Sequence, residues 1–167
     1  MTQARLTGLD IRSVPITHPD AQRLVDEVQA EYVLRYGGPD ETPIVPAHFE
    51  PPEGSFFVGY LDGVPVASGA WRRCTVEAFG TTETAEIKRM YVAPAARGAG
   101  HARRMLAHLE ASAAAAGARA LILETGSAQP KAIALYESSG YVPIPGFGYY
   151  RHAPLNRCFG KPLVAAD

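Results

Sequence analysis

The chain has few of the residues that mark metal centres, disulfide frameworks and membrane segments. Its 167 residues include only two cysteines, Cys74 and Cys158, which lie far apart and form no Cys-x-x-Cys pair. This spacing predicts neither a zinc motif nor a disulfide framework, and it suits a reducing cytoplasm. No basic segment followed by a long apolar core opens the sequence, and no apolar run reaches the about 18 residues of a membrane span. We therefore expect a cytoplasmic protein that is neither exported nor bound to a membrane.

An excess of either charge is also absent. The sequence has 16 Lys and Arg residues against 17 Asp and Glu, for a formal net charge of -1, and 47% of its residues are hydrophobic. These values indicate neither a nucleic-acid-binding surface nor a disordered chain. The histidines, His48 and His108 among them, have no metal-ligand spacing, so we expect no metal. The length fits one well-buried domain, which we predict over residues 1–167.

Apolar runs and turn residues predict an α/β domain. An Asp62-Gly63 pair, which tolerates positive φ, predicts a tight hairpin between two apolar runs. Residues 37–52 are rich in glycine and proline and predict an ordered loop over a site. The expected strands cover Asp10 to Val14, Ser55 to Leu61, Pro65 to Arg72, Ala85 to Val92 and Ala120 to Thr125, and final strands lie between Tyr141 and Phe159. Three helices are expected. The first starts at Pro19 or Asp20, the second runs from Ala102 to Gly117, and the third runs from Ala132 to Tyr141.

The most informative segment joins a strand to a helix through a loop of small residues, Val92 to Ala102. Gly98 and Gly100 allow a tight turn and a close approach of the backbone to a ligand. The helix that follows offers unpaired N–H groups and the positive end of its dipole, so we expect an anion there. Other phosphate loops fit less well, because no Gly-Lys-Ser/Thr follows and the third glycine of a dinucleotide fingerprint is missing.

The order and spacing of Arg97, Gly100 and Ala102 resemble the acetyl-coenzyme A signature Arg/Gln-x-x-Gly-x-Gly/Ala of the GNAT N-acetyltransferase superfamily. The resemblance implies a mixed, mostly antiparallel sheet with a splayed parallel strand pair and helices on both faces. It also implies acetyl-coenzyme A as cosubstrate. The residues that it assigns to the cosubstrate are Met90, Tyr91, Val92, Arg97, Gly98, Ala99, Gly100, His101, Ala102 and Arg103.

The resemblance also implies two catalytic residues. Tyr136 lies in a Leu-Tyr-x-x-x-Gly-aromatic sequence and corresponds to the tyrosine that protonates the departing thiolate. Glu86 begins the central strand and is the expected base. The alternatives are core packing for Tyr136, and an ion pair or a solvated strand end for Glu86. Strand alternation puts Glu86 and Met90 on one face and Tyr91 on the other, until a bulge breaks the pattern.

The acceptor is the least determined part of this prediction. A small amine, an amino-acid derivative and a protein N-terminus or lysine all remain open. The alternative to an enzyme is a noncatalytic acyl-coenzyme A sensor, and exposed sheet edges are compatible with a homodimer. The aromatic and histidine residues that we expect near the acceptor are Tyr32, Tyr36, His48, Phe49, Trp71, Tyr149 and Tyr150, and Arg151 and Arg157 are candidates for attracting an acidic acceptor.

Overall fold

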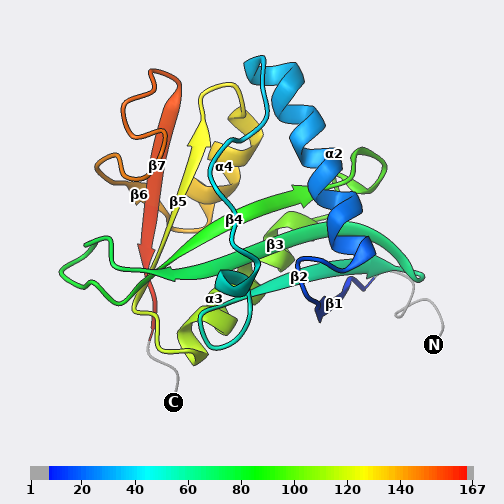
Figure 1. The fold of residues 1–167 in the computed structure, drawn as a ribbon, viewed down its shortest axis with the longest axis horizontal. Helices are drawn as coiled ribbons and strands as arrows, with labels where there is room; N and C mark the ends of the chain where they lie inside the picture. Colours follow the sequence, from blue (N-terminus) through cyan, green and yellow to red (C-terminus); the bar gives the residue numbers. More distant parts are fainter. Residues whose placement is uncertain (1–7, 165–167) are drawn as a thin grey trace.

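A seven-stranded sheet forms the centre of the molecule, for which the computed structural model describes residues 8–164 (Figure 1). The strand order is β1-β2-β3-β4-β5-β7-β6, and every neighbouring pair is antiparallel except β4 and β5. The predicted mixed sheet with one parallel pair is thereby confirmed. The strands are β1 (Asp10–Ser13), β2 (Gly54–Leu61), β3 (Val64–Cys74), β4 (Thr84–Val92), β5 (Ala120–Gly126), β6 (Val142–Pro143) and β7 (Asn156–Pro162).

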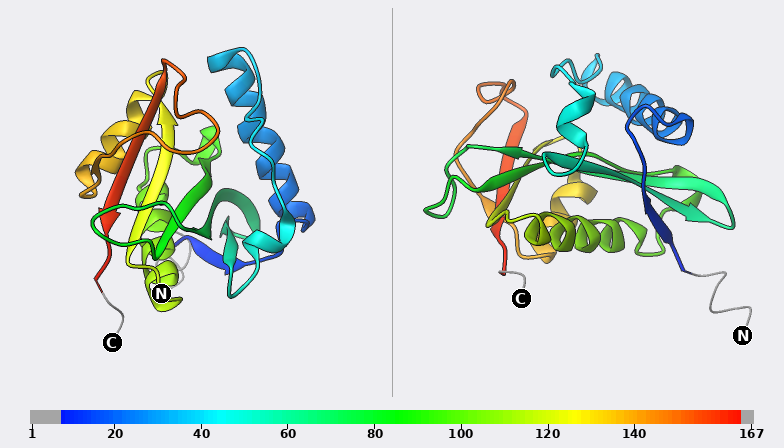
Figure 2. Two further views of the ribbon diagram at one scale, coloured as in Figure 1. Left: turned by 60° about the vertical axis from the view of Figure 1, so that its left-hand side comes forward. Right: turned by 60° about the horizontal axis from the view of Figure 1, so that its bottom comes forward.

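Helices cover both faces of this sheet, as Figure 2 shows. One face packs against α2, with Leu24 and Val28 in a core cluster that includes Phe56 and Tyr91. The other face packs against α3 and α4 in a larger cluster. The elements outside the sheet are α2 (Pro19–Tyr36), η1 (Pro46–Phe49), η2 (Pro94–Ala96), α3 (His101–Ala115) and α4 (Pro130–Ser138).

Local sequence signals explain most element boundaries. Asp62 and Gly63 have φ values of 48° and 78° in the turn between β2 and β3, so the predicted hairpin is confirmed. The imidazole Nδ1 of His18 accepts a hydrogen bond from the Asp20 amide at 3.0 Å and caps the start of α2. Gly117, with φ of 98°, lies just beyond the end of α3 as predicted.

A bulge in β4 breaks the alternation of its side chains. The register shifts between Ser68 and Ala70 of β3, so that Arg89 and Met90 together oppose the single residue Gly69. Arg89 has a φ of 57°. As a result Tyr91 packs on the α2 side and Met90 on the α3 side, the reverse of uninterrupted alternation.

The bulge lies where β4 and β5 separate. The two strands pair from Thr84 opposite Ala120 to Ile87 opposite Leu123, and no pairing joins them beyond that point. Strand β4 continues to Val92 and β5 to Gly126. The backbone edges that face each other in this splay therefore have no strand partner there, which leaves N–H and C=O groups available to a ligand.

Candidate active site

A cavity of about 500 Å³ lies between α2, the end of β4, the start of α3 and α4. Its lining includes all but one of the residues that the sequence assigns to the cosubstrate, and it includes Tyr136. The exception is Ala99. The predicted residues in the lining are Met90, Tyr91, Val92, Arg97, Gly98, Gly100, His101, Ala102, Arg103 and Tyr136. The structure therefore brings the loop, the end of β4 and the α4 tyrosine together.

The loop before α3 has the geometry of an anion cradle. Gly98 and Gly100 have φ values of 88° and 82°, a conformation that L side chains rarely adopt. A Cβ atom at either position would have no atom within 4 Å, so these glycines are needed for backbone conformation rather than for packing. The first amides of α3, from His101 on, have no helical carbonyl to bind, as in any helix, and no side chain caps them. These amides and the helix dipole favour an anion at this point.

Two arginines of this region are held by protein groups. The Nε atom of Arg97 donates to the Val92 carbonyl at 2.8 Å, its guanidinium pairs with Glu31, and its Cζ atom lies 5.7 Å from the Tyr91 ring centroid. Arg103 donates to the hydroxyls of both Ser138 and Ser139 and so links α3 to α4. Both side chains are therefore fixed by protein groups where they line the cavity.

Tyr136 lies at the junction of this cavity with a smaller one. Its side chain is buried, and its ring lies edge-on to the Tyr141 ring with centroids 5.7 Å apart. Burial, with a smaller contribution from Tyr32, raises the pKa of its phenol above the usual value, so the hydroxyl stays protonated at neutral pH. The Tyr136 hydroxyl is therefore a neutral hydrogen-bond donor where the two cavities meet.

The smaller cavity, of about 70 Å³, lies in the splay between β4 and β5 and is lined by charged groups. The residues that line both cavities are Tyr32, Met90, Gln129, Ala132 and Tyr136. Its charged lining residues are Asp40, Lys88, Arg89 and Glu124.

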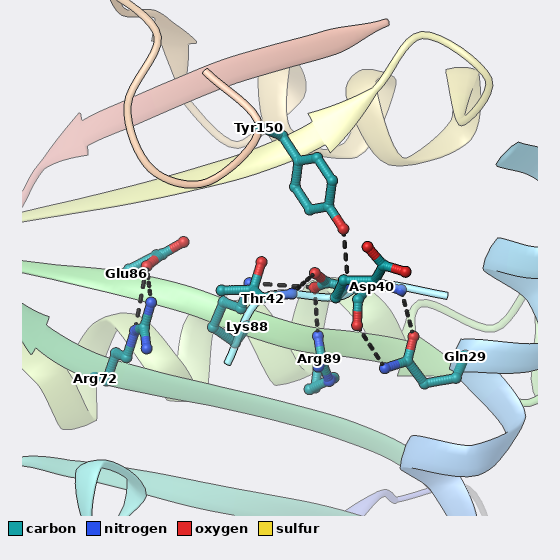
Figure 3. A network of polar contacts seen from close by, with 9 residues as sticks. Gln29, Asp40, Thr42, Arg72, Glu86, Lys88, Arg89 and Tyr150 are labelled. Atoms are coloured by element: carbon teal, nitrogen blue, oxygen red, sulfur yellow. Dashed lines mark hydrogen bonds and ion pairs between the residues drawn. The ribbon is translucent and has the colours of Figure 1, made fainter. Parts of the chain in front are cut away.

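A buried network centres on Asp40 in the loop after α2 (Figure 3). Its Oδ2 atom accepts from the Lys88 Nζ atom at 3.3 Å and from an Arg89 guanidinium nitrogen at 2.7 Å. Burial alone would raise the pKa of Asp40, but Lys88, hydrogen bonds from Thr42 and the Arg89 charge outweigh it and hold the pKa well below its usual range. Gln29 of α2 fixes the Asp40 backbone through two hydrogen bonds, of 2.8 and 3.1 Å.

Glu124, on β5, is a site residue that the motif-based prediction missed. It lies one residue beyond the last β4–β5 pair, and its Oε1 atom is buried without a hydrogen-bond partner. Burial, followed by the charge of nearby Glu86, raises the pKa of Glu124 to about 7. A lone acidic residue directly after the apolar run Leu121-Ile122-Leu123 was the available signal in the sequence.

Glu86 lies on the same face of the sheet as Glu124, but it lines neither cavity. Its Oε1 atom accepts two hydrogen bonds from Arg72, at 3.1 and 3.3 Å, and its side chain is buried. The ion pair that the sequence left open for Glu86 is therefore present (Figure 3). Its role as base stays a prediction.

Some of the residues expected near the acceptor lie at or beside the cavities, whereas others belong to the core. Tyr32 lines both cavities, and the Tyr36 hydroxyl accepts a hydrogen bond from Gln129 at 3.1 Å. The Tyr150 hydroxyl accepts a hydrogen bond from the Glu41 amide at 2.7 Å, next to Asp40. Trp71 and Phe49, in contrast, are core residues that line neither cavity. The indole of Trp71 donates to Ser112 of α3.

Among residues 8–164, no group of three or more His, Cys, Asp or Glu side chains is placed to hold a metal ion. In the same range, no helix combines the length and the apolar composition needed to cross a membrane.

Solved structures share this fold. A Klebsiella pneumoniae protein assigned to the acyl-CoA N-acyltransferases is 28% identical, with a TM-score of 0.74 over 95% of this chain and 99% of its own. An IAA acetyltransferase from Bacillus cereus is 19% identical, with a TM-score of 0.62 over 93% of this chain and 100% of its own. The latter likeness shows the fold alone.

The chain belongs to the acetyltransferase (GNAT) family, whose family model matches residues 21–141. A relative from Azospirillum brasilense, an IAA acetyltransferase, is 41% identical over 112 residues, which are 67% of this chain and 70% of the relative. Enzymes of this family use acetyl- or acyl-coenzyme A as cosubstrate and in general act on amine acceptors. The family assignment made from the Arg97 to Ala102 loop is therefore confirmed.

Proposed function

We propose that this protein is an N-acetyltransferase that moves the acetyl group of acetyl-coenzyme A to a primary amine by direct attack in a ternary complex. The observation that carries the proposal is the joining of two cavities at Tyr136. One cavity contains the glycine loop at the start of α3, and the other contains Glu124, Lys88 and Arg89. A cosubstrate and an acceptor could thus meet beside one buried phenol.

The residues present fit a coenzyme A diphosphate. The backbone at Gly98 and Gly100 has open space in front of it, and the first amides of α3 have no helical partner. The pantetheine arm would lie in the splay, where the β4 backbone from Met90 to Val92 has no partner on β5. The N–H groups of this edge are suited to stabilise the oxyanion that forms when the amine attacks.

Two proton transfers complete the reaction. The amine loses a proton as the nitrogen–carbon bond forms, and the sulfur gains one as the carbon–sulfur bond breaks. Tyr136 would supply the second proton, since its hydroxyl is protonated at neutral pH and its side chain lines both cavities. For the first proton the geometry adds Glu124 to the predicted Glu86. Glu124 lines the smaller cavity, which we call the acceptor cavity, and has a pKa of about 7, which suits a base at neutral pH.

The proposal is tested by acceptor-dependent release of free thiol from acetyl-coenzyme A. The panel contains small amines, amino acids, peptides and, because of the name of the Azospirillum brasilense relative, IAA. Steady thiol release with at least one amine, and mass-spectrometric detection of the N-acetyl product, supports the enzyme. Tight coenzyme A binding without turnover for any acceptor would instead favour the sensor, and no binding of coenzyme A would contradict both.

A further inference from the structure

Two buried cations share one carboxylate in the acceptor cavity. Lys88 is 8% exposed and Arg89 is 4% exposed, and both contact the same Oδ2 atom of Asp40. The Nε atom of Arg89 is buried and has no hydrogen-bond partner. Asp40 therefore balances only one of the two positive charges, and both cationic side chains line the smaller cavity. Excess charge beside a cavity favours an anionic ligand group there.

The other acids near this pair do not neutralise it. Glu86 is engaged by Arg72, and Glu124, with a pKa of about 7, carries a proton for part of the time at neutral pH. The β4 side of the cavity, at Lys88 and Arg89, is therefore positive, whereas the β5 side presents a carboxyl group that can take up a proton. The cavity has two chemically different ends.

We infer that the acceptor is a small amino acid, whose carboxylate binds Lys88 and Arg89 while its amino group faces Glu124. The inference rests on the proposed N-acetyl transfer and names the substrate class of that site. An amine and a carboxylate on one small molecule complement both ends of the cavity, and a guanidinium binds a carboxylate with charge-assisted hydrogen bonds.

The cavity volume of about 70 Å³ suits a group of a few non-hydrogen atoms. A protein N-terminus fits this site poorly, because its α-carboxyl group is part of a peptide bond. An amine without a carboxylate would leave the excess positive charge of Lys88 and Arg89 without a partner in the complex.

The test compares matched pairs of acceptors in the thiol-release assay. Glycine, L-alanine and β-alanine are each measured beside the corresponding carboxamide, which keeps the amine and the side chain but removes the negative charge. The amine of a carboxamide is the less basic of the two, so intrinsic reactivity at neutral pH favours the amide and makes the comparison stringent. We expect kcat/KM to favour at least one acid over its amide by about 10- to 100-fold.

A variant series assigns this preference to the cation pair. Arg89→Gln should lower kcat/KM for the preferred acid by about 10- to 100-fold and leave its amide nearly unchanged. Arg119→Gln, at a side chain that is 73% exposed, is the matched control and should behave as wild type. Calorimetric titration with coenzyme A verifies that the variant is folded. The loop proposed to bind the coenzyme A diphosphate does not include Arg89.

Different results overturn different statements. If the amides or peptide N-termini are acetylated as well as the acids, the inference fails and the proposed function stands. If Arg89→Gln lowers turnover of acid and amide equally, the Lys88–Asp40–Arg89 cluster is structural and the inference also fails. If no amine of any kind releases thiol, the proposed function fails, and the inference fails with it.

Discussion

Replacing Glu124 by glutamine should remove most of the activity and the ionisation that controls it. The pKa of about 7 arises from burial and from the charge of Glu86. At pH 7 about half of this carboxyl group is ionised, and at pH 5 about 1% is. If Glu124 accepts the amine proton, wild-type kcat/KM, corrected for the fraction of neutral amine, should rise about 100-fold from pH 5 to its plateau. Glu124→Gln should lower the plateau by about 10²- to 10⁴-fold, the usual contribution of a general base.

The assay is a pH profile of kcat/KM for thiol release with saturating acetyl-coenzyme A. Glu86→Gln separates the two carboxylates, because loss of the Glu86 charge lowers the pKa of Glu124 and moves the rising limb to lower pH. Glu83→Gln, at a side chain that is 61% exposed, is the control and should leave the profile unchanged. A full loss of activity in Glu86→Gln, with an unaltered profile in Glu124→Gln, would refute this reasoning and return the base role to Glu86.

Three further predictions address the acid, the loop and the core. Tyr136→Phe should lower kcat about 100-fold while the calorimetric Kd of coenzyme A stays unchanged, because the ring remains and only the proton donor is lost; equal kcat would remove Tyr136 from that role. Gly100→Glu should abolish the heat of coenzyme A binding, since it adds strain at φ of 82° and a negative charge beside the diphosphate. The control variant Ala99→Gly should bind coenzyme A as the wild type does. Binding by both variants would contradict the loop assignment. Leu121→Ala, at a fully buried site, should lower the free energy of unfolding in urea by about 2–5 kcal/mol. Leu34→Ala, at a side chain 87% exposed, should change it by no more than about 0.5 kcal/mol. Similar changes in the two variants would contradict the burial pattern.

Local physical rules explain which parts could be predicted from the sequence. The Asp62-Gly63 turn and the apolar spacing of α3 depend on residues close together in the chain, and both are confirmed. The glycine-rich turn before α3 could be predicted because its glycines and the helix start are contiguous in the chain.

The polar end of the site could not be predicted in the same way. Asp40 meets Lys88 across 48 positions of sequence, from a loop whose path no local rule specifies. The bulge at Arg89 depends on pairing with β3, and without it Arg89 would face away from Lys88. Glu124 gains its raised pKa only from burial and from Glu86 on the neighbouring strand. These features are produced by tertiary contacts.

The central claim is that the loop before α3 holds a diphosphate and thereby directs an acyl thioester into the splay of β4 and β5. A crystal structure of the protein with coenzyme A tests this most directly. The account predicts diphosphate oxygens within hydrogen-bond distance of amides between Gly98 and Arg103, with the thiol beside Tyr136. Coenzyme A bound elsewhere, or a diphosphate that no amide of this loop contacts, would contradict it.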